Sequence, residues 1–313
     1  GKKYNENSDY NGEEFKVDCS SDPSITVGMI THASKEDAIK ATEKAYNAFH
    51  KGDWSKCHWI KRAGCLIKAA DLMLAKRSEL TALIVYESGK SIIEALGDVD
   101  EAIDFLTFYA RSEQKIQLAG GNPMARGPVC SITPWNFPLA IPTGMTSAPL
   151  IAGNTVVLKS AEQTPLIAAA YVDIMHAAGV PEDVLIYVPG SGSVIGSTLV
   201  ENDHFAGQVF TGSKRVGQMI AHSAGKKLFK NPHNEKEYPV KSITEMGGKN
   251  GIIVTANAEL DETVSGILYS SFAHAGQKCS AASRVIVDAS VKESLIKRLR
   301  EACQDIEVSE AYN

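Results

Sequence analysis

The spacing of apolar residues divides the chain into a helical first part and an alternating second part. Residues 1–32 are mostly polar and contain two β-like pieces, FKVD and ITVGMI. Ser34 precedes Asp37 by three residues, which is close to a capping box at the start of a helix. Apolar positions at helical spacing then predict helices over 38–50, 56–75, 78–88 and 98–116, the last after a turn near Gly97.

After Gly120 the period changes, and short apolar runs alternate with helical segments. The runs within GPVCSITPW, TVVLK, VLIYVPG and GQVFTG predict strands, and helices are expected over 139–150, 164–179, 192–202 and 213–225. Short, continuous apolar strands are typical of a sheet that is covered on both faces. Residues 120–245 therefore predict an α/β domain with a doubly wound parallel sheet.

The last part of the chain continues the α/β pattern but is short. SITEMGG and GIIVT predict strands, ETVSGILYSSFAHAG a helix, RVIVD a strand and SVKESLIKRLREACQDI a final helix. One strand and one helix after Cys279 are too few to enclose a core, so we expect this domain to be incomplete. The predicted domains are 1–246 and 247–313.

Composition narrows the class of protein. The 313 residues are 44% hydrophobic and 22% charged, as in soluble globular proteins, and the net charge of −5 comes without a basic tract that would favour nucleic acid. No apolar run is long enough to span a bilayer, and the polar N-terminal segment lacks the apolar region of a signal peptide. Six cysteines without metal-like spacing predict free thiols in a reducing compartment, hence a cytoplasmic location and no metal site.

Candidate chemistry lies where the predicted strands end, since ligands of open α/β sheets bind beyond the carboxyl ends of strands. Two strand-to-helix turns, VPGSGSVIG and VFTGSKRVG, are rich in glycine and serine. Their backbone N–H groups suit a pyrophosphate, although such turns also occur as plain tight turns. The third glycine of GSGSVIG comes one position too late for the G-x-G-x-x-G fingerprint.

Three further strand ends carry polar side chains, and each of these groups allows two interpretations. Lys159 and Glu162 could bind the hydroxyls of a ribose, or could form a solvated strand end. Glu245 could act as a general base or be solvated, and Asn136 could donate to an oxyanion or shape a turn.

Cys279 is the candidate nucleophile, but a thiol with an ordinary pKa is mostly protonated at neutral pH. Lys278 adds positive charge nearby, although adjacent residues of an extended segment point apart. His274, on a predicted helix, could pair with the thiol, but a surface or core histidine is the simpler interpretation.

Five motifs occur in order: TPWNFP, KSAEQTP, FTGSKRVG, EMGGKN and GQKCSAASR. This series, from about residue 30 to the end of the chain, resembles that of the NAD(P)-dependent aldehyde dehydrogenases. The segment from ITEMGG to VIVD is most similar to the L-glutamate γ-semialdehyde (1-pyrroline-5-carboxylate) dehydrogenase module of the bifunctional proline utilization A family. The resemblance implies an aldehyde dehydrogenase-like α/β fold, an NAD-binding first domain and the start of a catalytic second domain.

The resemblance also implies a reaction, oxidation of L-glutamate γ-semialdehyde to L-glutamate in proline catabolism. Cys279 would attack the aldehyde and form a thiohemiacetal and then a thioester, Asn136 would hold the oxyanion, and Glu245 would activate water. The implied NAD-binding residues are Thr133, Pro134, Trp135, Lys159, Glu162, Gly192, Gly196, Thr211, Gly212 and Ser213. Glu101, Phe137 and Ser280 are the implied substrate-binding residues.

Two departures from the family pattern leave alternatives open. The downstream E-x-F-G-P motif does not occur, and the link QLAGGNPMARGPVC is shorter than is usual in the family. Another aldehyde dehydrogenase, for example for succinate semialdehyde, a thiol hydrolase using Cys279 and His274, and an inactive NAD-binding fragment are the alternatives. By resemblance we also expect a homo-oligomer for the full-length protein, and a fused or partner proline dehydrogenase module carrying FAD, which could place the protein peripherally at the inner membrane.

Overall fold

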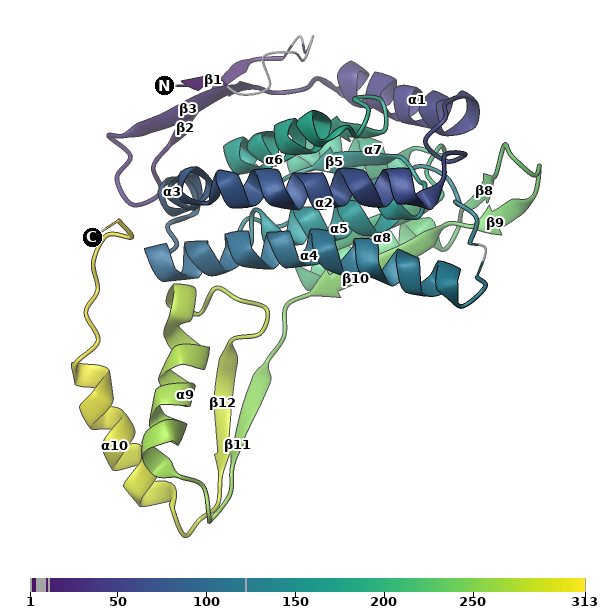
Figure 1. Ribbon diagram of the computed structural model, residues 1–313. Coiled ribbons are helices and arrows are strands. Elements are labelled where there is room, and N and C mark those ends of the chain that lie inside the picture. Colours follow the sequence, from purple (N-terminus) through teal and green to yellow (C-terminus); the bar gives the residue numbers. More distant parts are fainter. Residues whose placement is uncertain (1, 4–9, 11, 122, 313) are drawn as a thin grey trace. The chain divides into compact units, whose positions relative to one another are not determined.

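The structure is a computed structural model that describes residues 2–3, 10, 12–121 and 123–312. The chain forms two compact units, Gly1–Glu245 and Met246–Asn313. Figure 1 gives the labels of their helices and strands.

A five-stranded sheet forms the centre of the first unit. Its order is β10 (Lys241–Met246), β7 (Gly207–Gly212), β4 (Val129–Ile132), β5 (Val156–Lys159) and β6 (Leu185–Tyr187). The pairings of β4 with β5, β4 with β7 and β5 with β6 are all parallel. The chain adds β5 and β6 on one side of β4 and then crosses to β7 and β10 on the other, so the predicted doubly wound parallel sheet is confirmed.

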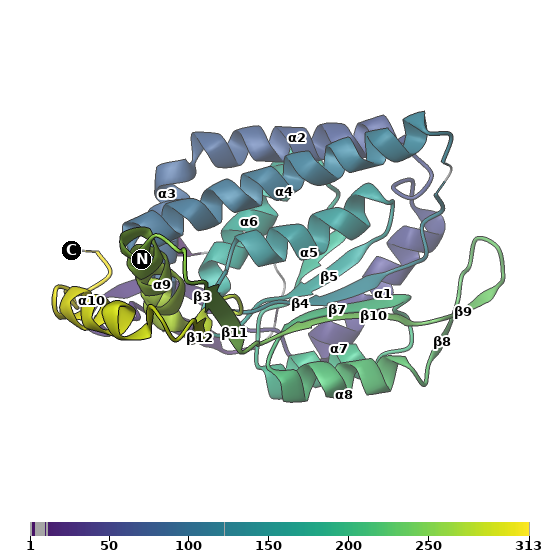
Figure 2. The same cartoon turned by 90° about the horizontal axis from the view of Figure 1, so that it is seen from below.

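Helices cover both faces of this sheet, which explains why β5 and β6 are buried along their whole length. Figure 2 shows one face covered by α5 (Ala140–Ile151) and α6 (Pro165–Ala178). Outside these two helices lie α2 (Trp59–Ala75), α3 (Arg77–Ser88) and α4 (Ile92–Leu118). The other face is covered by α1 (Lys35–Lys51), α7 (Ser197–Glu201) and α8 (Lys214–Ala224).

Smaller elements complete the first unit. A three-stranded sheet has the order β1 (Lys2–Lys3), β3 (Thr26–Thr31) and β2 (Glu14–Asp18). Strands β8 (Leu228–Lys230) and β9 (Glu237–Pro239) form an antiparallel hairpin that was not predicted from the sequence. A π-helical turn, η1 (Gly192–Gly196), precedes α7 where one helix was predicted. No helix of the described residues is long and apolar enough to cross a membrane.

The capping box at Ser34 is confirmed, whereas the turn predicted near Gly97 is wrong. The Ser34 hydroxyl accepts the N–H of Asp37, and the Asp37 carboxylate accepts the N–H of Ser34. Gly97 lies inside α4, and the chain reverses instead at Gly89, whose φ of 72° closes α3. The Ser91 side chain then caps α4, so local capping outweighs the low helix propensity of Gly97.

The second unit is a small α/β layer. Strands β11 (Asn250–Val254) and β12 (Ala282–Val287) are parallel, and α9 (Leu260–Phe272) connects them. A 3-10 turn, η2 (Ala273–Gly276), follows α9, and α10 (Lys292–Gln304) follows β12. The buried residues that the two helices and β11 bring together are Val254, Val264, Ile267 and Leu295.

A buried carboxyl group fixes the start of α6 in the first unit. Glu87, at the end of α3, accepts the N–H groups of Leu166 at 2.6 Å and Ile167 at 2.9 Å. These are donors of the first helical turn, which have no partner within the helix. Burial raises the pKa of Glu87 to about 8, even though the two N–H donors lower it.

Replacing Glu87 tests this arrangement through pH. The folded protein holds a proton that the unfolded chain releases near pH 4.5, so Glu87 makes stability fall as the pH rises from 4.5 toward 8. Glu87→Gln removes this titration. The unfolding midpoint temperature of the variant, relative to that of the wild type at the same pH, should therefore rise steadily between pH 5 and 8. Glu43→Gln, at an exposed site on α1, is the control. A difference between Glu87→Gln and the wild type that stays constant with pH would contradict the raised pKa.

Candidate functional site

The carboxyl ends of four parallel strands bring the predicted segments of the first unit to one edge of the sheet. Residues 133–137 follow β4, 160–162 follow β5, 188–192 follow β6, and Ser213 follows β7. The Thr133 N–H donates to the carbonyl oxygen of Lys159 at 3.0 Å, which continues the β4–β5 pairing beyond the strands. The strand order reverses between β4 and β7, which is where open α/β sheets bind ligands.

Three predicted cofactor residues lie together at this edge. Glu162 Oε1 accepts the N–H of Gly192. A Cβ atom on Gly192 would lie 3.6 Å from this oxygen and 3.8 Å from Lys159 Nζ, so the glycine leaves the space above the pair open. Lys159 is buried, and burial lowers its pKa while Glu162 opposes that shift. Lys159 is therefore not part of a solvated strand end, and its ammonium lies within the field of the exposed Glu162 carboxylate.

His32 belongs to the same surroundings and was missed in the sequence. It follows β3, and its ring stacks on Phe15 with 4.7 Å between ring centroids. Burial lowers the pKa of His32, Glu162 opposes this shift and Lys159 adds to it, so the imidazole lies within the field of both charges. Nothing in the polar N-terminal sequence pointed to this position.

The turn after β7 is shaped for close packing. The Ser213 hydroxyl accepts the N–H of Val216 and caps α8. A Cβ atom on Gly212 would lie 2.6 Å from the Phe210 ring, so any larger residue there would require that ring to shift. The Thr211 hydroxyl lies 3.3 Å from Met145 Sδ of α5. In contrast, a Cβ atom on Gly196 would meet no atom within 4 Å, so packing does not require that glycine.

The segment after β4 contacts a buried charged residue, Lys90, that was not among the predicted site residues. Thr133 and Pro134 are buried, whereas Trp135, Asn136 and Phe137 are partly buried. The Phe137 ring lies under the ammonium of Lys90, with Nζ 3.8 Å from the ring centroid. Lys90 in turn pairs with Asp98 of α4.

The sequence contains a signal that could have identified Asp98 as a buried charged residue. Asp98 lies on the buried stripe of α4 together with Ala95, Ala102 and Leu106. A charge on an apolar stripe indicates a buried partner. Glu101, the implied substrate residue on the same helix, is partly buried.

The second unit holds Cys279 in a loop that two motifs build together. Asn250 Nδ2 donates to the carbonyl oxygen of Cys279 at 2.7 Å and to that of Ala281 at 3.2 Å. A Cβ atom on Gly248 would lie 3.3 Å from the Cys279 carbonyl oxygen, so this glycine allows the close approach. The EMGGKN motif thus holds the backbone of the cysteine loop, while the thiol of Cys279 and the neighbouring Ser280 are exposed.

The predicted helix around His274 is wrong, because α9 ends at Phe272. His274, Ala275 and Gly276 all have positive φ, at 51°, 54° and 73°, and therefore turn the chain away from the helix. His274 is buried.

Lys278 Nζ lies 5.2 Å from the centroid of the Tyr269 ring. Glu245 is exposed on β10.

Asn250→Ala should loosen the cysteine loop because it removes both side-chain bonds to its carbonyl groups. We expect faster amide hydrogen exchange in residues 278–282 and a change in the rate of alkylation of Cys279. Asn257→Ala is the control, since Asn257 is an exposed asparagine of the same unit that bonds only locally to Thr255. Unchanged exchange in the Asn250 variant would show that the loop keeps its conformation without these bonds.

Comparison with known proteins places the fold and the site in context. Residues 9–313 match the aldehyde dehydrogenase family. The 1-pyrroline-5-carboxylate dehydrogenase of Staphylococcus saprophyticus is 36% identical, with 97% of this chain and 61% of the relative aligned. 1-Pyrroline-5-carboxylate dehydrogenase 2 of Bacillus subtilis is 37% identical over 93% of this chain and 58% of its own length. This chain thus spans about three fifths of the length of these relatives.

Solved structures agree with this placement. Proline utilization A from Bdellovibrio bacteriovorus is 39% identical with a TM-score of 0.90, covering 97% of this chain and 32% of that protein. A Thermus 1-pyrroline-5-carboxylate dehydrogenase with bound NAD is 35% identical with a TM-score of 0.89, covering 97% of this chain and 60% of that one. With its motifs on the strand ends of a doubly wound sheet and a match over nearly its whole length, this chain belongs to the aldehyde dehydrogenase family.

Proposed function

We propose that this chain is the NAD⁺-binding domain (1–246) and the start of the catalytic domain (247–313) of an enzyme that oxidises L-glutamate γ-semialdehyde to L-glutamate. The observation that carries the cofactor assignment is the group of Lys159, Glu162 and Gly192 at the carboxyl edge of the sheet. The substrate assignment is supported by relatives named 1-pyrroline-5-carboxylate dehydrogenase that align with more than nine tenths of this chain.

The residues at the sheet edge fit a dinucleotide. The Lys159 ammonium and the Glu162 carboxylate would bind the hydroxyls of the adenosine ribose, and the Ser213 turn at the start of α8 would bind the pyrophosphate. Because a carboxylate repels a 2′-phosphate, Glu162 favours NAD⁺ over NADP⁺. When bound, NAD⁺ supplies the hydride acceptor. The other residues proposed to line this site are Thr133, Pro134, Trp135, Gly192, Gly196, Thr211 and Gly212.

The chain's own residues would perform covalent catalysis. The Cys279 thiolate would form a bond to the aldehyde carbon, and the oxyanion would be held by the Asn136 amide and the Cys279 backbone N–H. Loss of hydride from this thiohemiacetal leaves a thioester on Cys279. Glu245 would take a proton from water, whose oxygen attacks the thioester carbon, and the Cys279 thiolate then leaves as L-glutamate forms.

Substrate selection is proposed for three positions. Ser280 would bind the substrate carboxylate, Phe137 would pack on its aliphatic chain, and Glu101 would meet its α-amino group. The similarity to part of proline utilization A supports a functional link to a proline dehydrogenase module carrying FAD. A homo-oligomeric and cytoplasmic full-length protein remains a prediction.

Cofactor binding can be measured on this chain. Glu162→Gln should weaken NAD⁺ binding by about tenfold, because losing one charge-assisted hydrogen bond costs roughly 1.5 kcal/mol. Binding of NADP⁺ should change less or improve. Fluorescence titration of both dinucleotides measures this, with Glu182→Gln at an exposed site as control. Equal affinities of the wild type for NAD⁺ and NADP⁺ would contradict the role given to Glu162.

The reaction is tested in the full-length protein by NADH absorbance with 1-pyrroline-5-carboxylate. Cys279→Ala should abolish turnover. Glu245→Gln should still release about one NADH per site in a burst and then turn over about 10²- to 10⁴-fold more slowly, because only thioester hydrolysis lacks its base.

Two other outcomes would favour a different activity. A wild-type enzyme that prefers succinate semialdehyde would move the assignment to another aldehyde dehydrogenase. Ester hydrolysis that needs His274 but not Glu245 would favour a thiol hydrolase.

A further inference from the structure

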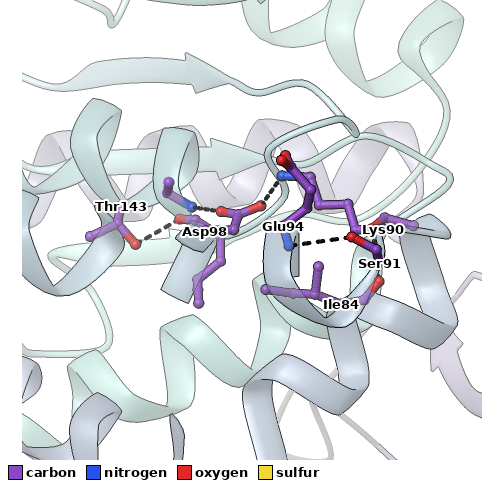
Figure 3. Close-up of polar contacts among 9 residues, drawn as sticks. Ile84, Lys90, Ser91, Glu94, Asp98 and Thr143 are labelled. Carbon is purple, nitrogen blue, oxygen red and sulfur yellow. Dashed lines mark hydrogen bonds and ion pairs between the residues drawn. The ribbon is translucent and has the colours of Figure 1, made fainter. Parts of the chain in front are cut away.

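An ion pair without any contact with solvent lies beneath the proposed active-site segment of the first unit. Lys90 Nζ lies 2.7 Å from Asp98 Oδ2, and both side chains are 0% exposed. Lys90 follows the turn at Gly89, and Asp98 lies in the second turn of α4 (Figure 3). A buried ion pair is weak evidence for stability, because desolvation offsets its Coulomb attraction and an apolar pair of similar size serves as well. Its position therefore calls for another explanation.

Asp98 holds the end of the segment that follows β4. Its second oxygen, Oδ1, accepts the N–H of Ala140 at 2.7 Å, and the backbone N–H of Leu139 also lowers the pKa of this carboxyl group. Ala140 is the first residue of α5, and its N-cap residue, Leu139, offers no side-chain cap. Asp98 therefore caps α5 from a neighbouring helix.

Donors on both Asp98 oxygens suit a carboxylate, which only accepts hydrogen bonds. Burial raises the pKa of Asp98, and the Lys90 ammonium and the two N–H groups oppose this shift. The ammonium thus favours the charged form of the Asp98 cap against the effect of burial.

Lys90 reaches the same segment by a second contact. Its ammonium lies 3.8 Å from the centroid of the Phe137 ring. Such a cation–π contact is strongest when both groups are desolvated, as is the ammonium here. The segment between β4 and α5 is consequently fixed at three points, by the Thr133 N–H on Lys159, by Phe137 on Lys90 and by Ala140 on Asp98.

We propose that Lys90 and Asp98 are positioning residues that set the orientation of Asn136 and Phe137. Lys90 fixes the ring of Phe137 and thereby the selection of the aldehyde chain, and Asp98 fixes the backbone that carries the Asn136 amide. The catalytic consequence rests on the proposed function, whereas the conformational consequence does not.

Two double variants separate the contributions, since removing one charge alone would leave the other buried and unpaired. Lys90→Met with Asp98→Asn removes both charges but keeps an amide oxygen for the Ala140 N–H. Lys90→Met with Asp98→Leu also removes the cap. The control is Arg77→Met with Asp100→Asn, which removes an ion pair of 2.6 Å between α3 and α4 whose side chains are exposed to solvent.

The first measurement is amide hydrogen exchange of residues 135–141. The variant with Asp98→Leu should exchange this segment at least tenfold faster than the wild type. The exchange rate of the variant with Asp98→Asn should lie closer to that of the wild type. The surface control should exchange this segment at the same rate as the wild type. Protection of the segment equal to the wild type in both buried-pair variants overturns the positioning role, and this outcome does not depend on any enzymatic activity.

The second measurement is kinetic and uses the full-length enzyme with 1-pyrroline-5-carboxylate and a series of unbranched aldehydes. The variant with Asp98→Asn should raise KM and flatten the preference among aldehydes, with kcat within about threefold of the wild type. The variant with Asp98→Leu should also lower kcat at least tenfold, with the Kd for NAD⁺ within twofold.

Kinetic constants like those of the wild type in folded variants overturn the link to catalysis. An inactive wild type would overturn the proposed function instead, and hydrogen exchange would still decide the positioning role. If the variant with Asp98→Leu does not fold, the one with Asp98→Asn still tests the contact with Phe137.

Discussion

The parallel pairing of β4 with β5 on one side and β7 on the other is the constraint on which the site depends. Parallel strands end at one edge, so any residue that directly follows a strand is brought there whatever its distance in sequence. Lys159 and Ser213 are more than fifty positions apart along the chain, but Lys159 ends β5 and Ser213 follows β7, the two strands that flank β4. Helices cover both faces of the sheet, so a strand that slid along its neighbour would lose its packing against them as well as its hydrogen bonds.

Buried ionisable groups of the first unit lie at the ends of helices and strands rather than at random in its core. Glu87 caps α6, Asp98 caps α5, and Lys159 ends β5 beside Glu162. Each group satisfies backbone donors or a neighbouring charge where a strand or helix ends, since an element's own hydrogen bonds run out there. Short connections between sheet and helix can therefore be rigid even though they lack regular structure, which a site built on such connections requires.

The sequence predicted the features that depend on local pattern. Strand and helix alternation after Gly120 led to the doubly wound sheet, and Ser34 was identified as a cap from its spacing to Asp37. The predictions failed where a local signal competed with tertiary context. Gly97 suggested a turn, but the Ser91 cap and the packed stripe of α4 carry the helix through it. The helix expected to reach Gly276 stops earlier, because three residues with positive φ follow it.

Pairs far apart in sequence stayed hidden for a different reason. Lys90 and Phe137 are more than forty positions apart, and neither residue alone indicates the other. The predicted site residues Cys279, Asn136 and Glu101 came from resemblance, and their roles remain proposals.

Adjacency in sequence is a poor guide to the electrostatics of the candidate nucleophile. Lys278 precedes Cys279, yet its ammonium lies over the ring of Tyr269, a residue of α9 nine positions earlier. The carbonyl oxygen of Cys279 is in turn bound by Asn250, which orients the peptide on the other side of the thiol. Because the peptide that follows Cys279 is held by this bond, the Cys279 side chain projects from a backbone whose rotation is restricted. The Cys279 N–H of the proposed oxyanion site belongs to the preceding peptide, whose Lys278 carbonyl oxygen accepts the N–H of Ala281 at 3.1 Å. A donor that is already oriented loses no entropy when charge develops. Asn250 thus connects the glycine motif to the chemistry of the cysteine through the backbone, without a contact to the sulfur.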